Sequence, residues 1–226
     1  SRSEIVTCKS DYGFVDQGFG SYGMNWVNQR LYSAWLGDRA EGLAFGLPSW
    51  ISHGLSDYIS GSRLMNNKLE FRDYVRDLIN FKIAVAQGRH LPVRDLVQQT
   101  NVEFWGANQE YQGISDRMAQ ADTFVRFLLS PEARGKQTKG LLASYLQNLL
   151  AVVAEVEQEN IKEKGEASTA PKTEAEEEAL YKQRSSEWKS SEREKQIVSR
   201  TFTRTFGAWT DKDWDAVEKA FMKYID

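Results

Sequence analysis

Apolar residues recur at the spacing of an α-helix along most of this chain, and this period limits its fold more than any other feature. In residues 22–36, Met24, Val27 and Leu31 lie on one helical face. The same period continues in residues 48–60, 69–86, 92–99, 115–129, 140–158 and 212–225. A helix with one apolar face must bury that face against another element. The sequence therefore predicts a multi-helix, mainly α domain.

The N-terminal residues differ from this pattern. Residues 4–8 are rich in β-branched side chains, which favours a short strand. Residues 11–23 combine glycines with aromatic side chains and predict an irregular segment. The GFGSYG within them lacks the spacing of a phosphate-binding loop. Little β structure is therefore expected, and only at the N-terminus.

Charge and composition exclude several classes of function. The formal net charge is -3, and acidic and basic residues alternate without forming a basic stripe, which argues against nucleic-acid binding. No apolar run reaches the roughly 20 residues of a membrane span. Cys8 is the single cysteine, so no disulfide can form within the chain.

Residues 157–196 form a segment in which charged residues and serines dominate. Such a composition buries too little apolar surface to offset the entropy of ordering the chain. We interpret it as a charged insertion, partly disordered or helical at its flanks, between residues 1–156 and 197–226, which form one helical domain. The alternative is a partner-binding helix around Leu180, Tyr181 and Trp188.

One motif is more specific than the periodicity. Residues 47–58 read LPSWISHGLSDY. This segment resembles LPxWxxEGLAEY of the thermolysin-like (gluzincin) zinc metallopeptidases, in the branch called peptidase MA-like. Residues 121–129 and 206–224 resemble two later elements of that family, in the same order. The resemblance covers residues 22–226 and implies the helical part of a gluzincin fold.

The departures from the family pattern concern its catalytic centre. The resemblance implies a zinc-ligand glutamate where this chain has His53, and an upstream HExxH helix that supplies two ligands and the general base. In the matching register Asn25, Trp26 and Gln29 occupy those three positions, and no HExxH exists in the chain. A catalytic zinc needs three protein ligands and a base. We therefore expect no catalytic residues, no metal and no cofactor, although the question of enzyme activity stays open.

Other residues of this vestigial site have two interpretations. His53 and Asp57 are four residues apart and can share a helix face, yet His53 can equally be a half-buried residue bonded to Asn25, Asn28 or Gln29. Trp35, Trp50 and Tyr58 can line a cleft for a ligand, although large aromatic side chains are more often core residues. His90 is predicted to be a surface residue.

The leading hypothesis is a pseudoenzyme: a metallopeptidase-like domain with a binding or structural role, whose partner is a peptide or a protein. Members of the family are often exported bacterial proteins, which favours export. One alternative is a zinc peptidase whose missing ligands lie outside this chain. The other is a helical scaffold or interaction module unrelated to peptidases. The sequence names neither a ligand nor an oligomeric state.

Overall fold

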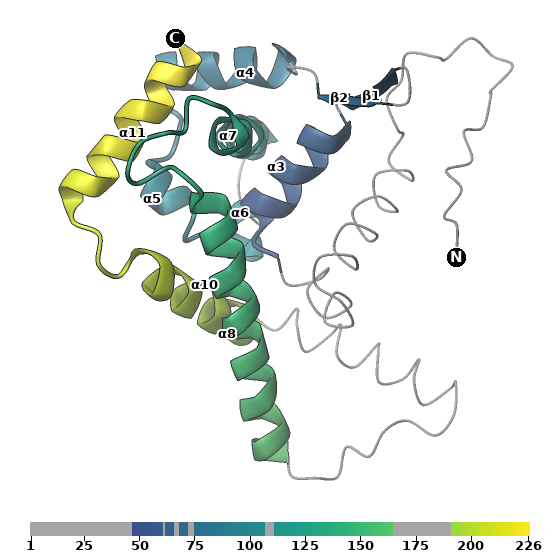
Figure 1. Ribbon diagram of the computed structural model, residues 1–226, viewed down its shortest axis with the longest axis vertical. Helices are drawn as coiled ribbons and strands as arrows, with labels where there is room; N and C mark the ends of the chain where they lie inside the picture. Colours follow the sequence, from purple (N-terminus) through teal and green to yellow (C-terminus); the bar gives the residue numbers. More distant parts are fainter. Residues whose placement is uncertain (1–46, 61, 66–67, 72–74, 107–110, 165–190) are drawn as a thin grey trace, which may run out of the picture.

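The computed structural model describes residues 47–60, 62–65, 68–71, 75–106, 111–164 and 191–226, and this part of the chain is mainly helical (Figure 1). Its elements in chain order are α3 (Ser49–Ser60), β1 (Ser62–Met65), β2 (Lys68–Phe71), α4 (Val75–Ala86), α5 (Val93–Leu96), α6 (Asn101–Trp105), α7 (Tyr111–Leu129), α8 (Leu141–Lys164), α10 (Ser191–Phe206) and α11 (Asp211–Ile225). The predicted mainly α fold is thereby confirmed. Among the helices described, none is long and apolar enough to cross a membrane.

Helix α7 lies at the centre of the structure, where Figure 1 shows it end-on between α3, α4 and α11. Its residues 116–128 are buried except for the half-buried Met118, and the buried residues include the charged Asp116, Asp122 and Arg126. Gly54 brings α3 close to α7, because a Cβ atom at this position would lie 2.5 Å from Cγ2 of Val125. The missing side chain therefore allows the two helices to meet at backbone distance.

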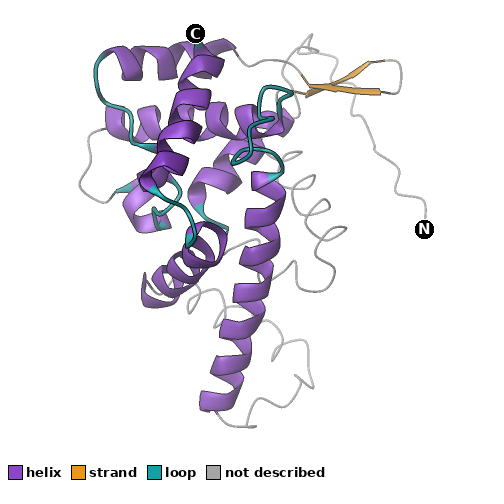
Figure 2. Cartoon of the chain, turned by 60° about the vertical axis from the view of Figure 1, so that its left-hand side comes forward, coloured by secondary structure: helices purple, strands orange, loops and turns teal. Residues whose placement is uncertain are grey.

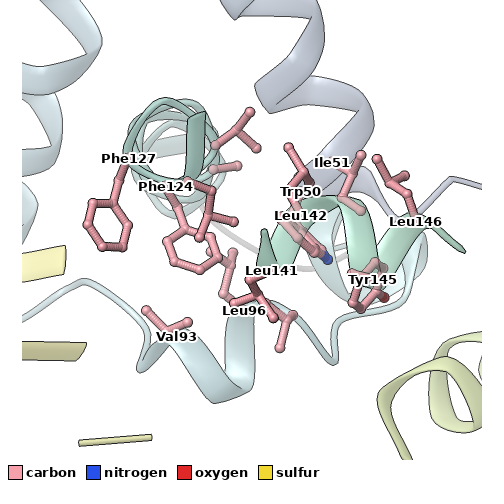
Figure 3. Close-up of a cluster of buried hydrophobic side chains, with 14 of the residues drawn as sticks. Trp50, Ile51, Val93, Leu96, Phe124, Phe127, Leu141, Leu142, Tyr145 and Leu146 are labelled. Carbon is pink, nitrogen blue, oxygen red and sulfur yellow. The ribbon is translucent and has the colours of Figure 1, made fainter. Parts of the chain in front are cut away.

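The hydrophobic core joins α3, α5, α7 and α8 (Figure 3). Trp50 is 2% exposed, and its ring packs edge-on against Tyr145 with the centroids 5.2 Å apart. The ring of Phe124 of α7 packs against the same indole, with the ring centroids 5.8 Å apart. Burying each aromatic side chain of this size contributes about 1.5–3 kcal/mol through the hydrophobic effect.

A second aromatic group connects the C-terminal helices. Phe206 and Trp209, at the end of α10, meet Trp214 of α11 with ring centroids 4.8 Å apart. Helix α10 also lies beside α8, where Arg204 donates to the Glu155 carboxylate at 2.9 Å (Figure 2). These contacts position the C-terminal helices against the same core.

The structure corrects the predicted helix over residues 69–86. Helix α4 begins at Val75, and residues 68–71 instead form strand β2, paired antiparallel with β1. The pairing register places Met65 opposite Lys68 and Ser62 opposite Phe71. Figure 2 shows the hairpin projecting from the helices.

Other predicted boundaries shift. Helix α7 begins at Tyr111 rather than at Ser115, and residues 101–105 form a short helix, α6. Helix α8 continues to Lys164 and α10 begins at Ser191, so both ends of the predicted insertion are helical. Glu159 accepts a hydrogen bond from Arg200 at 2.8 Å, which joins α8 to α10 within this region. The strand predicted at residues 4–8 and the helix at 22–36 lie outside the described residues.

Candidate functional site

A pocket of about 330 Å³ lies between α3, α4 and α7. Its size is at the lower end of the roughly 300–1,000 Å³ typical of small-ligand sites. The lining combines charged, polar and apolar side chains. They are His53, Asp57, Arg76, Asp77, Asn80, Tyr111, Ile114, Ser115 and Met118. The motif at residues 47–58 therefore contributes two residues to this pocket.

His53 and Asp57 form the α3 wall of the pocket as a close side-chain pair. Nε2 of His53 lies 2.9 Å from Oδ2 of Asp57, and the side chains are 14% and 25% exposed. The predicted common face of the two residues is confirmed. The imidazole also packs edge-on against Trp105, 6.1 Å away between centroids. These contacts hold the His53 ring in one orientation.

Asp77 forms the facing wall on α4. Its side chain is 13% exposed, and its Oδ1 atom lies 3.9 Å from Nε of Arg76. Burial raises the pKa of Asp77, and the nearby Asp57 carboxylate raises it further. Asp77 is thus a desolvated carboxyl group at a pocket wall. Sequence reasoning missed it, because a single acidic residue in an amphipathic helix carries no signal.

A buried ion pair supports the pocket from α7. Nε of Arg126 lies 2.8 Å from Oδ2 of Asp122, and the two side chains are 7% and 1% exposed. Desolvation raises the pKa of Asp122 to about 6, although the bond from Arg126 acts in the opposite direction. Arg126 Nη2 also donates to the backbone carbonyl of Asp57 at 3.2 Å. The pair therefore fixes the end of α3 that carries Asp57.

The aromatic residues predicted as cleft-lining have different environments. Trp50 is buried in the core, so the alternative interpretation, a core residue, applies to it. Tyr58 is half-buried and lies against the Arg126 guanidinium, 5.4 Å from the ring centroid. Trp35, Asn25, Trp26 and Gln29 lie outside the described residues. The hydrogen bond from His53 to Asn25, Asn28 or Gln29 therefore stays a prediction, as does the cleft-lining role of Trp35.

The structure also corrects the prediction for His90. It is half-buried rather than a surface residue, and its ring packs edge-on against Phe81 at 6.4 Å. The neighbouring Glu218 of α11 has a carboxyl pKa that is raised mainly by burial. His90 therefore belongs to the packing between the α4–α5 connection and α11, away from the pocket lining.

The pocket brings together a histidine, two carboxylates and a serine, which invites a comparison with nucleophilic hydrolases. In such a site the serine hydroxyl is hydrogen-bonded to the histidine. Among the described contacts none joins Ser115 to His53, whose Nε2 faces Asp57 instead. The described residues also include no group of three His, Cys, Asp or Glu side chains placed to hold a metal ion.

Comparison of the chain with known proteins found no relative. No family model, no curated protein and no solved structure matches it.

Proposed function

We propose that this chain is a non-catalytic, metallopeptidase-like domain that acts by binding a peptide or a protein. The observation that carries the proposal is the state of His53. It stands where the resemblance of LPSWISHGLSDY to the metallopeptidase motif implies a zinc-ligand glutamate, and its Nε2 atom lies 2.9 Å from Oδ2 of Asp57. A catalytic zinc needs three protein ligands, and the described residues around His53 include no group of three His, Cys, Asp or Glu side chains placed to hold a metal ion.

The packing around the motif supports the same proposal. Gly54 lets α3 approach α7 closely, and the buried Asp122–Arg126 pair is joined to the backbone at Asp57. Such supporting contacts fix the orientation of side chains at a site. The resulting pocket has polar walls from α3 and α4 and apolar side chains from α7, a combination typical of ligand sites.

The test measures zinc and peptide cleavage on the same purified sample. The 226-residue chain is incubated with zinc, dialysed and assayed for bound metal, and then offered a mixture of unstructured peptides. We expect substoichiometric zinc and no cleavage. A His53→Ala variant is the matched control, because any residual activity that it retains comes from a contaminant rather than from this site. Stoichiometric zinc together with cleavage that His53→Ala abolishes would overturn the proposal.

A further inference from the structure

The chemistry of the pocket indicates which group it receives. Among the described residues, two carboxylates, Asp57 and Asp77, line it together with the Arg76 guanidinium and the His53 imidazole, and the imidazole is paired with Asp57. The Arg76 side chain is 74% exposed and therefore largely hydrated, whereas that of Asp77 is 13% exposed. Asp77 is thus the carboxyl group of this pocket that the protein removes most from water. A cationic group would restore the solvation that Asp77 has lost.

The shape of the pocket distinguishes among cations. A volume of about 330 Å³ far exceeds the space that one metal ion or one water requires. Met118 and Ile114 supply apolar surface from α7, and Tyr111 supplies an aromatic ring that is 87% exposed at the rim. An apolar stem with a charged head fits such a lining, since long basic side chains bury their stems along apolar surface.

The remaining polar groups favour a guanidinium over an ammonium. Asn80 and Ser115 add acceptor oxygens to those of the two carboxylates, on walls contributed by three helices. A guanidinium presents five donors in a plane, is weakly hydrated and stacks on aromatic rings. An ammonium is compact and loses more hydration on entering a partly apolar pocket.

We propose that the pocket between α3, α4 and α7 binds the arginine side chain of a peptide segment, with Asp77 as the principal partner of the guanidinium. This inference rests on the proposed binding function and specifies the ligand of the same pocket. Asp57 contributes as the second carboxylate while it keeps its contact with His53.

The experiment measures the affinity of the full chain for blocked pentapeptides by isothermal titration calorimetry. The peptides are identical except for a central arginine, lysine or citrulline, and citrulline keeps the shape of arginine without its charge. We expect the arginine peptide to bind roughly tenfold or more tightly than the citrulline peptide, because hydrogen bonds to charged groups are the stronger ones. Free L-arginine should bind more weakly than the peptide, since it lacks the flanking residues that extend beyond the pocket.

Two variants complete the test. Asp77→Asn should remove the preference for arginine over citrulline, whereas Asp215→Asn, which changes an exposed carboxylate of α11, should keep it. A thermal melt of Asp77→Asn shows that the variant is folded. Equal affinity for arginine and citrulline peptides, for arginine and lysine peptides, or for free arginine and the arginine peptide would overturn the assignment, as would the absence of binding. These outcomes differ from zinc-dependent cleavage, which alone overturns the proposed function.

Discussion

Gly54 is the residue on which the approach of α3 to α7 depends. A Cβ atom there would lie 2.5 Å from Val125 Cγ2 and 2.7 Å from the carbonyl oxygen of Ala121. Gly54→Ala should therefore lower the free energy of unfolding by about 1–3 kcal/mol, although alanine is the better helix former. Urea denaturation measures this change. Ser52→Ala, on the same helix, should stay within about 0.5 kcal/mol, and equal effects of the two variants would contradict the close approach.

The Asp122–Arg126 pair makes the stability of the protein depend on pH. Arg126→Met leaves the Asp122 carboxylate buried without its cation, which should cost about 3–5 kcal/mol at pH 8. The folded-state pKa of Asp122 is about 6, above its unfolded value, and losing Arg126 raises it further. The stability that depends on a protonated Asp122 is therefore kept at low pH and lost as the pH rises through the folded-state pKa of Asp122.

The measurement for this pair is urea denaturation at pH 5 and at pH 8. The loss caused by Arg126→Met should be smaller at pH 5, where more of the Asp122 carboxyl group is protonated. The double variant Asp122→Asn, Arg126→Met should recover much of the stability at pH 8, because no buried charge remains. A loss that is independent of pH, or a double variant as unstable as Arg126→Met, would show that Asp122 is not the cause.

Single residues also show where sequence reasoning succeeds. The i, i+4 spacing placed His53 and Asp57 on one helix face, and the structure joins them at 2.9 Å. Asp77 could not be found in this way. Its environment arises from the packing of α4 on α7, between residues distant in the sequence, and no local pattern marks it.

At the scale of elements, α6 illustrates how local hydrogen bonds define a short helix. Thr100 accepts a hydrogen bond from the Glu103 backbone N–H at 3.2 Å, and the Glu103 carboxylate accepts one from the Thr100 N–H at 2.8 Å. This reciprocal capping box starts a helix of five residues. Thr100→Ala should lower the free energy of unfolding by about 0.5–2 kcal/mol.

Thermal or urea denaturation measures the effect of Thr100→Ala, and Thr100→Ser is the matched control because serine keeps the accepting hydroxyl. Thr100→Ser should retain nearly the full free energy of unfolding. If Ala and Ser were equally destabilising, lost packing of the Thr100 methyl group rather than capping would explain the result, since Thr100 is 5% exposed.

Elements with a long 3.6-residue period were predictable, and the hairpin was not. Helices α3 and α11 begin within about one residue of their predicted starts, because Pro48 and Thr210 mark these positions. Of the predicted helix over residues 92–99, only Val93–Leu96 is helical. Residues 69–71 were instead assigned to a helix that follows them. Leu69 and Phe71 fit either period over so short a stretch, and only the pairing with β1 decides between them.

At the scale of the whole molecule, Trp50 is a residue of the core rather than of a cleft. Its ring contacts Phe124 of α7 and Tyr145 of α8, so it joins three helices. Trp50→Ala should lower the free energy of unfolding by about 3–5 kcal/mol, the range for large aromatic truncations in a core. Trp105→Ala, which removes a 45% exposed ring, should cost far less. A small effect of Trp50→Ala in urea denaturation would contradict the core assignment.

The arrangement of the helices explains why a fold can be anticipated while a function is harder to assign. Amphipathic periods predict that α3, α7, α8 and α11 share a core, and the structure places them around one. The pocket depends on three helices meeting at defined distances, which no single period specifies. The motif at residues 47–58 indicated one wall of the pocket, and the fold supplied the others.

The central claim is that the His53 position no longer holds a catalytic metal. A crystal structure of the chain grown with excess zinc, with anomalous data collected at the zinc absorption edge, tests it most directly. We expect no anomalous peak at His53 and a retained contact between His53 Nε2 and Asp57. A strong peak within about 2.1 Å of a His53 ring nitrogen, completed by side chains from residues 25–29, would contradict it.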